Sequence, residues 1–306
     1  MHTLPKIIVP PLKCQGIKTK LVPLILANAR IPNNGVWIEP FMGSAVVGLN
    51  VRPKKALYAD LNPHLINFYA ALKASAITPE IARAYLEKEG CLLAERGEEY
   101  YYSLRQRFNR EGNPLDFLFL SRACFNGMIR FNGKGGFNVP FCRKPQRFSK
   151  SYITKIVNQI AKFYTLLQLF DWSFICQDFE QTMNSATEND FIYCDPPYSG
   201  RHVDYFNTWT NADEERLFKC LSATQAKFIL STWHSNKYRS NDFLTSLWSR
   251  FQVITQEHFY HVGAKEDNRN PMLEALVMNF IPGCGKIEKP KIVQPSLFDM
   301  AAQPLC

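Results

Sequence analysis

The sequence lacks the features that would place the protein in a membrane, outside the cell or around a structural metal. Its nine cysteines form no C-x-x-C pair, and their odd number in a chain of 306 residues argues against a disulfide framework and against a zinc site. No run of about 18 apolar residues is present, so we expect no transmembrane helix. The proline-rich start, MHTLPKIIVPPLK, does not resemble a secretory signal. Together these absences predict a cytoplasmic protein with free thiols and no metal.

The charge balance favours a polyanionic partner. Lys and Arg together number 36, Asp and Glu 27, and the formal net charge is +9. Such an excess is typical of proteins that bind nucleic acid, although many basic proteins bind neither nucleic acid nor a membrane. The apolar content of 46% allows a sizeable core. Composition by itself therefore leaves the partner open.

Four short apolar runs each end on an acidic residue. They are GVWIE, which ends at Glu39, KALYAD at Asp60, WSFICQD at Asp178 and FIYCD at Asp195. Continuous apolar runs of this length predict strands of a sheet that is covered on both faces. Because ligands in open α/β sheets bind outside the carboxyl ends of the strands, the four acids predict a site.

The rest of the chain predicts a larger α/β protein with an insertion. Asn62 and Pro63 are typical of a helix start, and three later runs, AKFILSTW, FQVITQEHFYHV and MLEALVMNF, raise the sheet to about seven strands. Over residues 74–160, charged helices and a basic loop interrupt the alternation of predicted strands and helices. We interpret this segment as an inserted, mainly helical domain. The predicted units are a core of 1–73 and 161–281, the insertion 74–160, and a flexible tail 282–306.

The stretch EPFMGS predicts a strand, a tight turn at Gly43 and a helix that starts near Ser44. Glycine would let the backbone approach a ligand closely, and Asp60 follows at the end of the next strand, where an acid commonly binds ribose. With one glycine the stretch is no dinucleotide fingerprint. An ordinary structural turn explains it equally well.

The stretch DPPY, residues 195–198, is more informative. Proline has no N–H and a fixed φ, so Pro196 and Pro197 hold the backbone carbonyl beside Asp195 in one direction. A carboxylate and a fixed carbonyl are two acceptors, which match the two donors of an –NH2 group. Tyr198 adds a flat stacking surface. The alternative is a strand-end turn whose prolines only block pairing. The combination suits a planar base with an exocyclic amine.

Four motifs in order, EPFMGS, YADLN, FNVPF and CDPPY, resemble those of the Dam-like, alpha-group DNA adenine-N6 methyltransferases. The resemblance extends from PPLKCQGIKTK to about residue 280, and PPLKCQGIKTK and HVDYFN look especially like the EcoRV-type enzymes of restriction-modification systems. It implies a Rossmann-like class I methyltransferase fold, S-adenosylmethionine as cofactor, and methyl transfer to adenine N6 in a short duplex DNA site. A flipped target base and a site beginning GAT are further expectations.

The resemblance also implies residue roles. Asp195 and the Pro196 carbonyl would accept hydrogen bonds from the target amine, Pro197 completes the motif, and Tyr198 would stack on the base. One departure is Cys14, which stands where Dam itself has tryptophan, so stacking is not expected there. The implied cofactor-binding residues are Cys14, Lys18, Glu39, Phe41, Gly43, Asp60, Asp178, Phe179 and Asp195.

The basic loop of the insertion is similar to the DNA-recognition hairpin of the family. Without the resemblance, a solvated basic loop with a few packed aromatic residues would explain it. The implied DNA-binding residues are Lys13, Arg122, Phe125, Asn126, Met128, Arg130, Asn132 and Lys134. Farther along, QPSLF at Gln294–Phe298 resembles the pentapeptide that binds the bacterial sliding clamp, and a disordered end is the alternative.

Two other functions stay open at this point. One keeps the fold but methylates RNA adenine or cytosine N4, and the other is a DNA-binding protein without catalysis. Asp195 and the order of the motifs favour adenine in DNA as the substrate. Because Asp195 and Asp60 are both present, they argue against a DNA-binding protein without catalytic activity.

Overall fold

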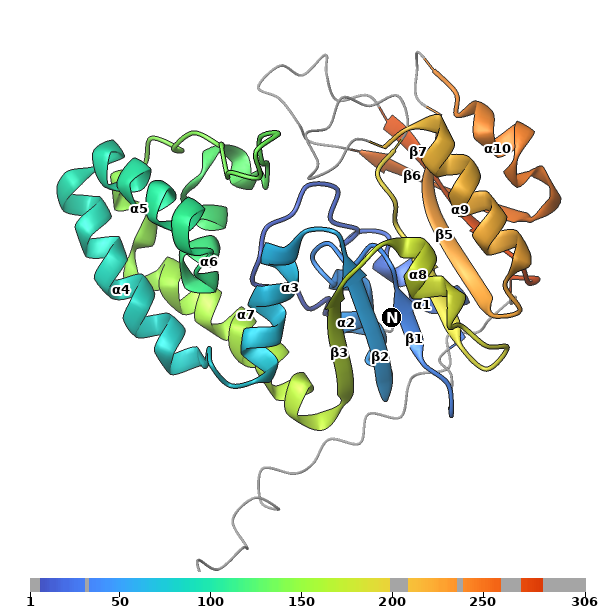
Figure 1. The fold of residues 1–306 in the computed structure, drawn as a ribbon, viewed down its shortest axis with the longest axis horizontal. Coiled ribbons are helices and arrows are strands. Elements are labelled where there is room, and N and C mark those ends of the chain that lie inside the picture. Colours follow the sequence, from blue (N-terminus) through green and yellow to red (C-terminus); the bar gives the residue numbers. More distant parts are fainter. Residues whose placement is uncertain (1–5, 31–32, 199–208, 236–238, 260–270, 283–306) are drawn as a thin grey trace, which may run out of the picture.

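The computed structural model describes residues 6–30, 33–198, 209–235, 239–259 and 271–282. A seven-stranded sheet forms its centre, in the order β3-β2-β1-β4-β5-β7-β6 (Figure 1). The strands β1 to β5 run parallel, and β7 is antiparallel to both β5 and β6. Their bounds are Trp37–Glu39 (β1), Lys55–Asp60 (β2), Asp171–Cys176 (β3), Phe191–Cys194 (β4), Lys227–Ser235 (β5), Gln252–Phe259 (β6) and Pro271–Met278 (β7). The predicted Rossmann-like α/β fold with about seven strands is confirmed.

The strand order reverses beside β1. From β1 the chain continues outward to β2 and β3, whereas β4 lies on the other side of β1 and leads to β5. In the β1–β4 pair, Trp37 lies opposite Phe191 and Ile38 opposite Ile192. A sheet of this kind leaves a crevice outside the carboxyl ends of the strands at the reversal point. Glu39 and Asp195 stand at that point, because each lies at the carboxyl end of its strand.

The prediction that all four acid-ending strands are covered on both faces is wrong for β3. Every residue of β1 and β4 is buried, but β3 is the edge strand and buries only Trp172 fully. Ser173, Ile175 and Cys176 are exposed. An apolar run alone does not distinguish an edge strand from a central one, since the difference depends on which elements cover the sheet.

Short helices pack around the sheet, and their ends follow local sequence signals. Asn62 Oδ1 accepts from His64 N at 3.0 Å and Pro63 occupies the first helical position, as predicted. Thr210 and Asp213 form a capping box at the start of α9. These helices are α1 (Val22–Asn28), α2 (Val46–Val51), α3 (Pro63–Lys73), α8 (Phe179–Asn184), α9 (Asn211–Ala223) and α10 (Asp242–Ser246), with a 3-10 turn η3 (Trp248–Arg250).

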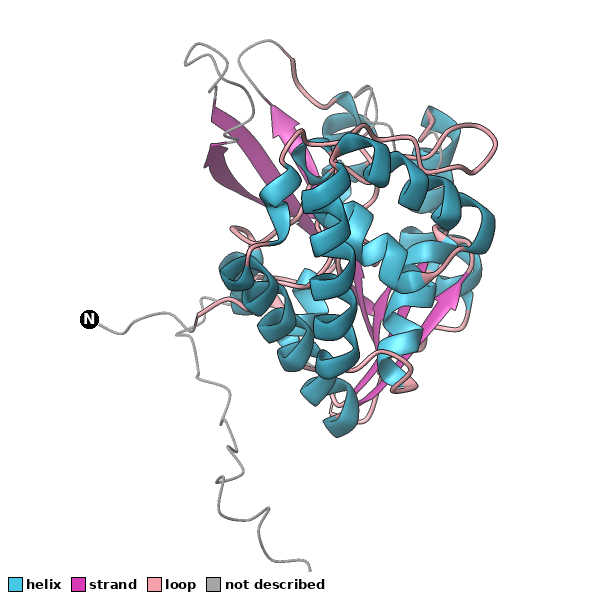
Figure 2. Ribbon diagram, turned by 90° about the vertical axis from the view of Figure 1, so that its left-hand side faces the viewer, coloured by secondary structure: helices cyan, strands magenta, loops and turns pink. Residues whose placement is uncertain are grey.

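A second group of helices lies beside the sheet, between α3 and β3 in the chain (Figures 1 and 2). It consists of α4 (Pro79–Arg96), α5 (Glu98–Glu111), α6 (Pro114–Ala123) and α7 (Lys150–Leu169). The predicted boundary at residue 160 falls inside the unbroken helix α7. We therefore place the end of this helical unit at Leu169. Within the described ranges, no helix is long and apolar enough to span a membrane.

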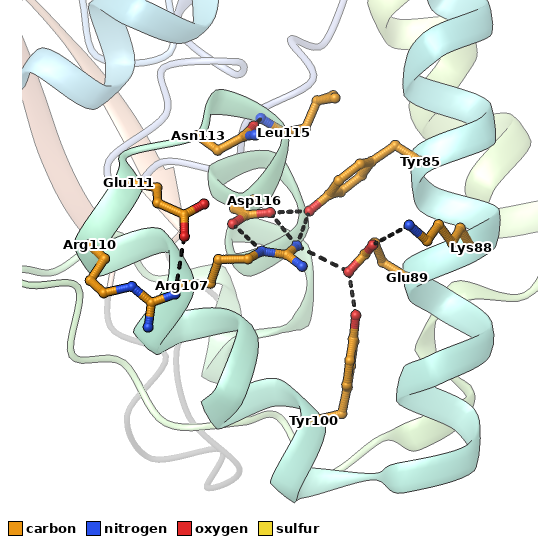
Figure 3. Close-up of polar contacts among 10 residues, drawn as sticks. All are labelled: Tyr85, Lys88, Glu89, Tyr100, Arg107, Arg110, Glu111, Asn113, Leu115 and Asp116. Carbon is orange, nitrogen blue, oxygen red and sulfur yellow. Dashed lines mark hydrogen bonds and ion pairs between the residues drawn. The ribbon is translucent and has the colours of Figure 1, made fainter.

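An ionic network holds three of these helices together (Figure 3). Arg107 of α5 donates to Asp116 of α6 at 2.6 and 2.9 Å and to Glu89 of α4 at 3.1 Å. Tyr85 and Tyr100 donate their hydroxyls to Asp116 and Glu89 respectively. Both carboxylates are fully buried, so the shared guanidinium compensates charges that would otherwise be costly. The network fixes the position of α6 and of the basic loop that follows it.

The basic loop folds back on itself. Antiparallel bridges join Cys124 to Phe141 and Phe131 to Phe137, and 3-10 turns occur at Phe125–Gly127 (η1) and Pro145–Phe148 (η2). Gly127 has φ +66°, and a Cβ added there would lie 2.5 Å from Lys13 Cδ. The N-terminal Lys13 therefore packs directly on the loop, although they are far apart in sequence.

A candidate cofactor and target-base site

A cavity of about 300 Å³ lies outside the carboxyl ends of β1, β2 and β4. Its wall combines the turn after β1, the turn after β2, the start of α8 and the residues after β4. It contains all nine residues that the sequence analysis assigned to the cofactor: Cys14, Lys18, Glu39, Phe41, Gly43, Asp60, Asp178, Phe179 and Asp195. Strands that are distant in sequence thus bring the motifs to one place, at the reversal point of the sheet.

Asp195 is paired with a buried lysine. Lys18 Nζ lies 2.8 Å from Asp195 Oδ1 and donates to the Gly16 carbonyl at 3.0 Å. Burial raises the pKa of the Asp195 carboxyl and nearby Glu274 raises it further, while the charge of Lys18 opposes both effects. The carboxylate is therefore desolvated but compensated, as an acceptor for an amine requires.

The rest of DPPY is divided between the cavity and its surroundings. Pro197 lines the cavity, whereas Pro196 is buried. Tyr198 donates its hydroxyl to Glu274 Oε2 of β7 at 2.7 Å, and its ring centroid lies 4.9 Å from Lys18 Nζ. Glu274 is only 1% exposed. The ring of Tyr198 is thus fixed at one end, beside Asp195.

The turn after β1 is organised by Asp60. Its two carboxylate oxygens accept from Gly43 N and Asn62 N, both at 2.9 Å, and burial raises its pKa. Gly43 has φ +48°, and a Cβ added there would have no atom within 4 Å, so its backbone is open toward the cavity. The helix starts at Val46 rather than near Ser44, because Ala45 adopts a left-handed conformation. The predicted turn is present, with a helix that starts later and is short.

Glu39 is a buried acid in the cavity wall. Trp37 Nε1 donates to Glu39 Oε1 at 2.8 Å, and burial raises the pKa of Glu39 to about 8. A Cβ on Gly48 would lie 2.2 Å from Tyr58 Oη and 2.7 Å from Glu39 Oε1, so α2 can approach only with glycine there. Among the described residues, no group of three His, Cys, Asp or Glu is arranged to hold a metal ion.

An aromatic cluster closes the other end of the cavity. Phe41 stacks on Phe179 with centroids 5.2 Å apart, and Trp209 lies 5.5 Å from Phe41 and 5.6 Å from Phe179. Asp178 begins α8 by accepting from Glu180 N. Trp209 and three further wall residues, Asp213, Arg216 and Tyr193, were not predicted. Tyr193 lies in the apolar run FIYCD, which was predicted only as a strand, and the other three belong to no motif and are marked by no spacing in the sequence.

The predicted DNA-binding residues are not all on the surface. Phe125 is 50% exposed, Asn126, Asn132 and Lys134 are also exposed, and Lys13, Met128 and Arg130 are partly buried. Arg130 Nε donates to Asn138 Oδ1 across the loop, and Asn132 Oδ1 accepts from two backbone N–H groups of its own turn.

Arg122 lies in the interior, whereas a direct contact to DNA needs an exposed side chain, so its predicted DNA contact stays a prediction that its position does not favour. The residue is 3% exposed, and its guanidinium donates to the Pro11 carbonyl and, at 2.7 Å, to Gln159 Oε1. It ties the N-terminal segment to α6 and α7. HVDYFN, at 202–207, lies outside the described residues.

The chain is similar to several DNA methyltransferases. It is 28% identical over 281 residues to the type II methyltransferase M.FokI of Planomicrobium okeanokoites, covering 88% of this chain and 42% of that protein. It is 33% identical to the DNA adenine methylase of Serratia marcescens, over 67% of this chain and 75% of that one. To M.MjaIII of Methanocaldococcus jannaschii it is 29% identical, over 89% of this chain and 99% of that one. The chain thus spans less than half the length of M.FokI.

A family model for D12 class N6 adenine-specific DNA methyltransferases matches residues 15–262, which is more than half of the chain. The match includes every strand from β1 to β6 and the whole cavity wall except Cys14. The chain belongs to the D12 class N6 adenine-specific DNA methyltransferase family.

Proposed function

We propose that this protein is a site-specific DNA methyltransferase that transfers the methyl group of S-adenosylmethionine to adenine N6 in duplex DNA. One observation carries the proposal. Asp195 and Pro197 of the DPPY stretch line the same cavity as Asp60 and Asp178, the two acids assigned to the cofactor. The predicted acceptor for the target amine and the predicted cofactor residues thus line one cavity, as direct transfer between two bound molecules requires.

The cavity fits S-adenosylmethionine in size and in chemistry. About 300 Å³ is at the lower end of the range for small-molecule sites. Phe41, Phe179 and Trp209 would supply flat apolar surface for an adenine, and Asp60 and Asp178, which line the same cavity, would accept from ribose hydroxyls and from the adenine amine. When bound, the cofactor supplies an electrophilic methyl group on a sulfonium sulfur.

The acceptors after β4 would activate the target nitrogen. The lone pair of the adenine N6 is delocalised into the ring, which makes the amine a poor nucleophile. Asp195 and the Pro196 carbonyl, by accepting hydrogen bonds from its two N–H groups, would draw the nitrogen toward tetrahedral geometry and free the lone pair. Because the acceptors are already held in place, this assistance requires little reorganisation during the reaction.

The helical unit would supply the contacts to DNA. A duplex hides N6, so the target base has to leave the stack, at a cost of a few kcal/mol. Exposed Phe125 can occupy the vacated space and Lys134 can contact a phosphate, while Ile129 of the same loop reaches the cavity wall. The loop therefore connects the DNA surface to the site of transfer.

Labelled S-adenosylmethionine offered with duplex DNA, with RNA or without nucleic acid tests the activity. We expect label in DNA and, after digestion, in N6-methyladenine. Label in RNA or in N4-methylcytosine would establish one of the alternative substrates, and no label with intact DNA binding would establish a silent DNA-binding protein. Sequencing a plasmid that was expressed together with the protein gives the methylated site.

The recognition sequence and a binding partner for the C-terminal segment can be tested separately. An EcoRV-type specificity predicts modified adenines in sites that begin GAT, and methylation elsewhere would exclude it.

Gln294–Phe298 lies outside the described residues, and clamp binding through it stays a prediction. Calorimetry of a peptide that covers residues 288–302 against a bacterial sliding clamp tests it, because the absence of heat at micromolar concentrations would refute it.

A further inference from the structure

Arg216 on α9 connects three carboxylates at the aromatic end of the cavity. Its Nη2 lies 2.8 Å from Asp178 Oδ1 and 2.9 Å from Glu180 Oε2, and its Nη1 lies 3.1 Å from Asp213 Oδ1. The guanidinium carbon lies 4.7 Å from the centroid of the Phe179 ring. Arg216 also lines the cavity. One side chain thus joins α9 to the start of α8.

We propose that Arg216 is a positioning residue that presents one oxygen of Asp178 to the exocyclic amine of the cofactor's adenine. The inference rests on the proposed cofactor but concerns a residue outside every motif. It assigns to α9 a part in recognising the adenine.

The hydrogen bonds to Asp178 carry this inference. Glu180 N donates to Asp178 Oδ1 at 2.9 Å, and Arg216 Nη2 donates to the same oxygen at 2.8 Å. Across the described ranges, no hydrogen bond reaches Oδ2. Two donors on Oδ1 hold the carboxylate in one orientation and leave Oδ2 able to accept, and Asp178 is one of the residues that line the cavity. A carboxylate oxygen accepts from an amine and repels a carbonyl, so this acceptor selects adenine over its 6-oxo counterpart.

The remaining contacts of Arg216 keep its guanidinium from rotating. Glu180 binds both Nε, at 3.3 Å, and Nη2, and Asp213 holds Nη1 from within α9. Phe179 supports the planar face. A lysine ammonium is a compact charge and lacks the planar set of N–H donors of a guanidinium, so it can pair with one carboxylate but cannot bridge all three. The geometry therefore requires arginine rather than only a positive charge.

Calorimetry with two ligands separates positioning from general stability. S-adenosylhomocysteine carries the adenine amine, and S-inosylhomocysteine carries a carbonyl at the same ring position. The full-length protein is expected to bind the adenosyl ligand about tenfold more tightly, which is the scale of one hydrogen bond to a charged group. In Arg216→Gln this preference falls to about twofold or less, mainly through weaker binding of the adenosyl ligand.

Arg250→Gln is the matched control, because Arg250, like Arg216, stacks on aromatic rings, at 4.8 Å from Phe218 and 5.0 Å from Phe251, but is exposed and does not line the cavity. It should keep the full preference. The preference of Arg216→Lys for the adenosyl ligand should lie between the preferences of the wild type and of Arg216→Gln. If Arg216→Gln is too unstable to measure, Arg216→Lys provides the test. An unchanged preference in both Arg216 variants, or an equal loss for both ligands, overturns the inference. If the wild type binds neither ligand, the proposed cofactor itself is wrong.

Discussion

Lys18 Nζ and Asp195 Oδ1 lie 2.8 Å apart in an ion pair between a buried lysine and a partly buried aspartate at the reversal point of the sheet. Lys18 comes from the N-terminal segment and is 5% exposed, and Asp195 follows β4. The pair sets the charge state of the residue assigned to the target amine. Lys18 also lines the cavity, so its ammonium group supplies a positive charge there.

The pH dependence of methyl transfer should move when Lys18 is replaced. Burial raises the pKa of Asp195 and Lys18 opposes that shift. Transfer needs the anionic carboxylate, so activity falls as pH decreases through this pKa. In Lys18→Gln the pKa of Asp195 rises further, and the acidic limb of the kcat profile moves to higher pH. Lys55→Gln, an exposed lysine at the start of β2, is the control. An acidic limb at the wild-type position would refute this coupling.

Asp195→Ala should separate chemistry from binding. Loss of a preorganised group that acts in the transition state lowers kcat by about a hundredfold or more. The proposed DNA contacts lie in the helical unit, so the dissociation constant for DNA should stay within about threefold of the wild-type value, which is under about 1 kcal/mol. Single-turnover transfer and fluorescence anisotropy measure the two quantities. Parallel loss of both would mean that Asp195 supports the fold.

Stability should decrease with rising pH because of Glu39. Burial raises its pKa to about 8, so the folded state favours the protonated acid. This contribution is complete below the ordinary pKa of a glutamate and is lost as pH rises through the folded value. Glu39→Gln stays neutral, so its melting temperature should fall less than that of the wild type on going to alkaline buffer, by about 2 °C or more. Identical pH dependence of the two proteins would show that Glu39 does not titrate in this range.

Arg122 and Lys134 should respond differently to substitution, although the sequence assigned both to DNA. Lys134 is exposed, so Lys134→Gln should reduce the salt dependence of DNA binding by about one unit of slope without lowering the melting temperature. Arg122→Gln loses buried hydrogen bonds, so it should destabilise the protein by about 1–3 kcal/mol and leave the slope unchanged. A changed slope in Arg122→Gln with normal stability would restore its predicted role.

The hydrogen bond from Tyr198 to Glu274 should orient the base-stacking ring. Tyr198→Phe and Glu274→Ala should each weaken stacking of an extruded 2-aminopurine by about fivefold, which is the scale of one hydrogen bond. The double variant should lose no more than the worse single one. Glu274→Gln keeps an acceptor for the Tyr198 hydroxyl, so its stacking of 2-aminopurine should stay near the wild-type value. Additive losses would mean that the two residues act independently.

Local sequence determined much of this protein. Apolar runs that end in Glu39, Asp60, Asp178 and Asp195 became four neighbouring strands or their immediate extensions, because short-range patterning specifies a strand and parallel strands align their carboxyl ends. Asn62 and Pro63 likewise predicted the start of α3, since helix capping depends on adjacent residues. The order of the motifs was sufficient to indicate the family and, through the resemblance, nine of the residues that line the cavity.

Tertiary structure alone decided the surroundings of those residues. Arg216, Trp209 and Glu274 reach the site from α9, the segment before it and β7, and no local pattern records which distant elements will meet. Burial is equally non-local, so Arg122 in a basic stretch became an interior hydrogen-bond donor and β3 became an exposed edge. Short motifs thus identify the residues that carry the proposed chemistry. The neighbours that set the pKa and the orientation of these residues depend on packing between segments far apart in the chain.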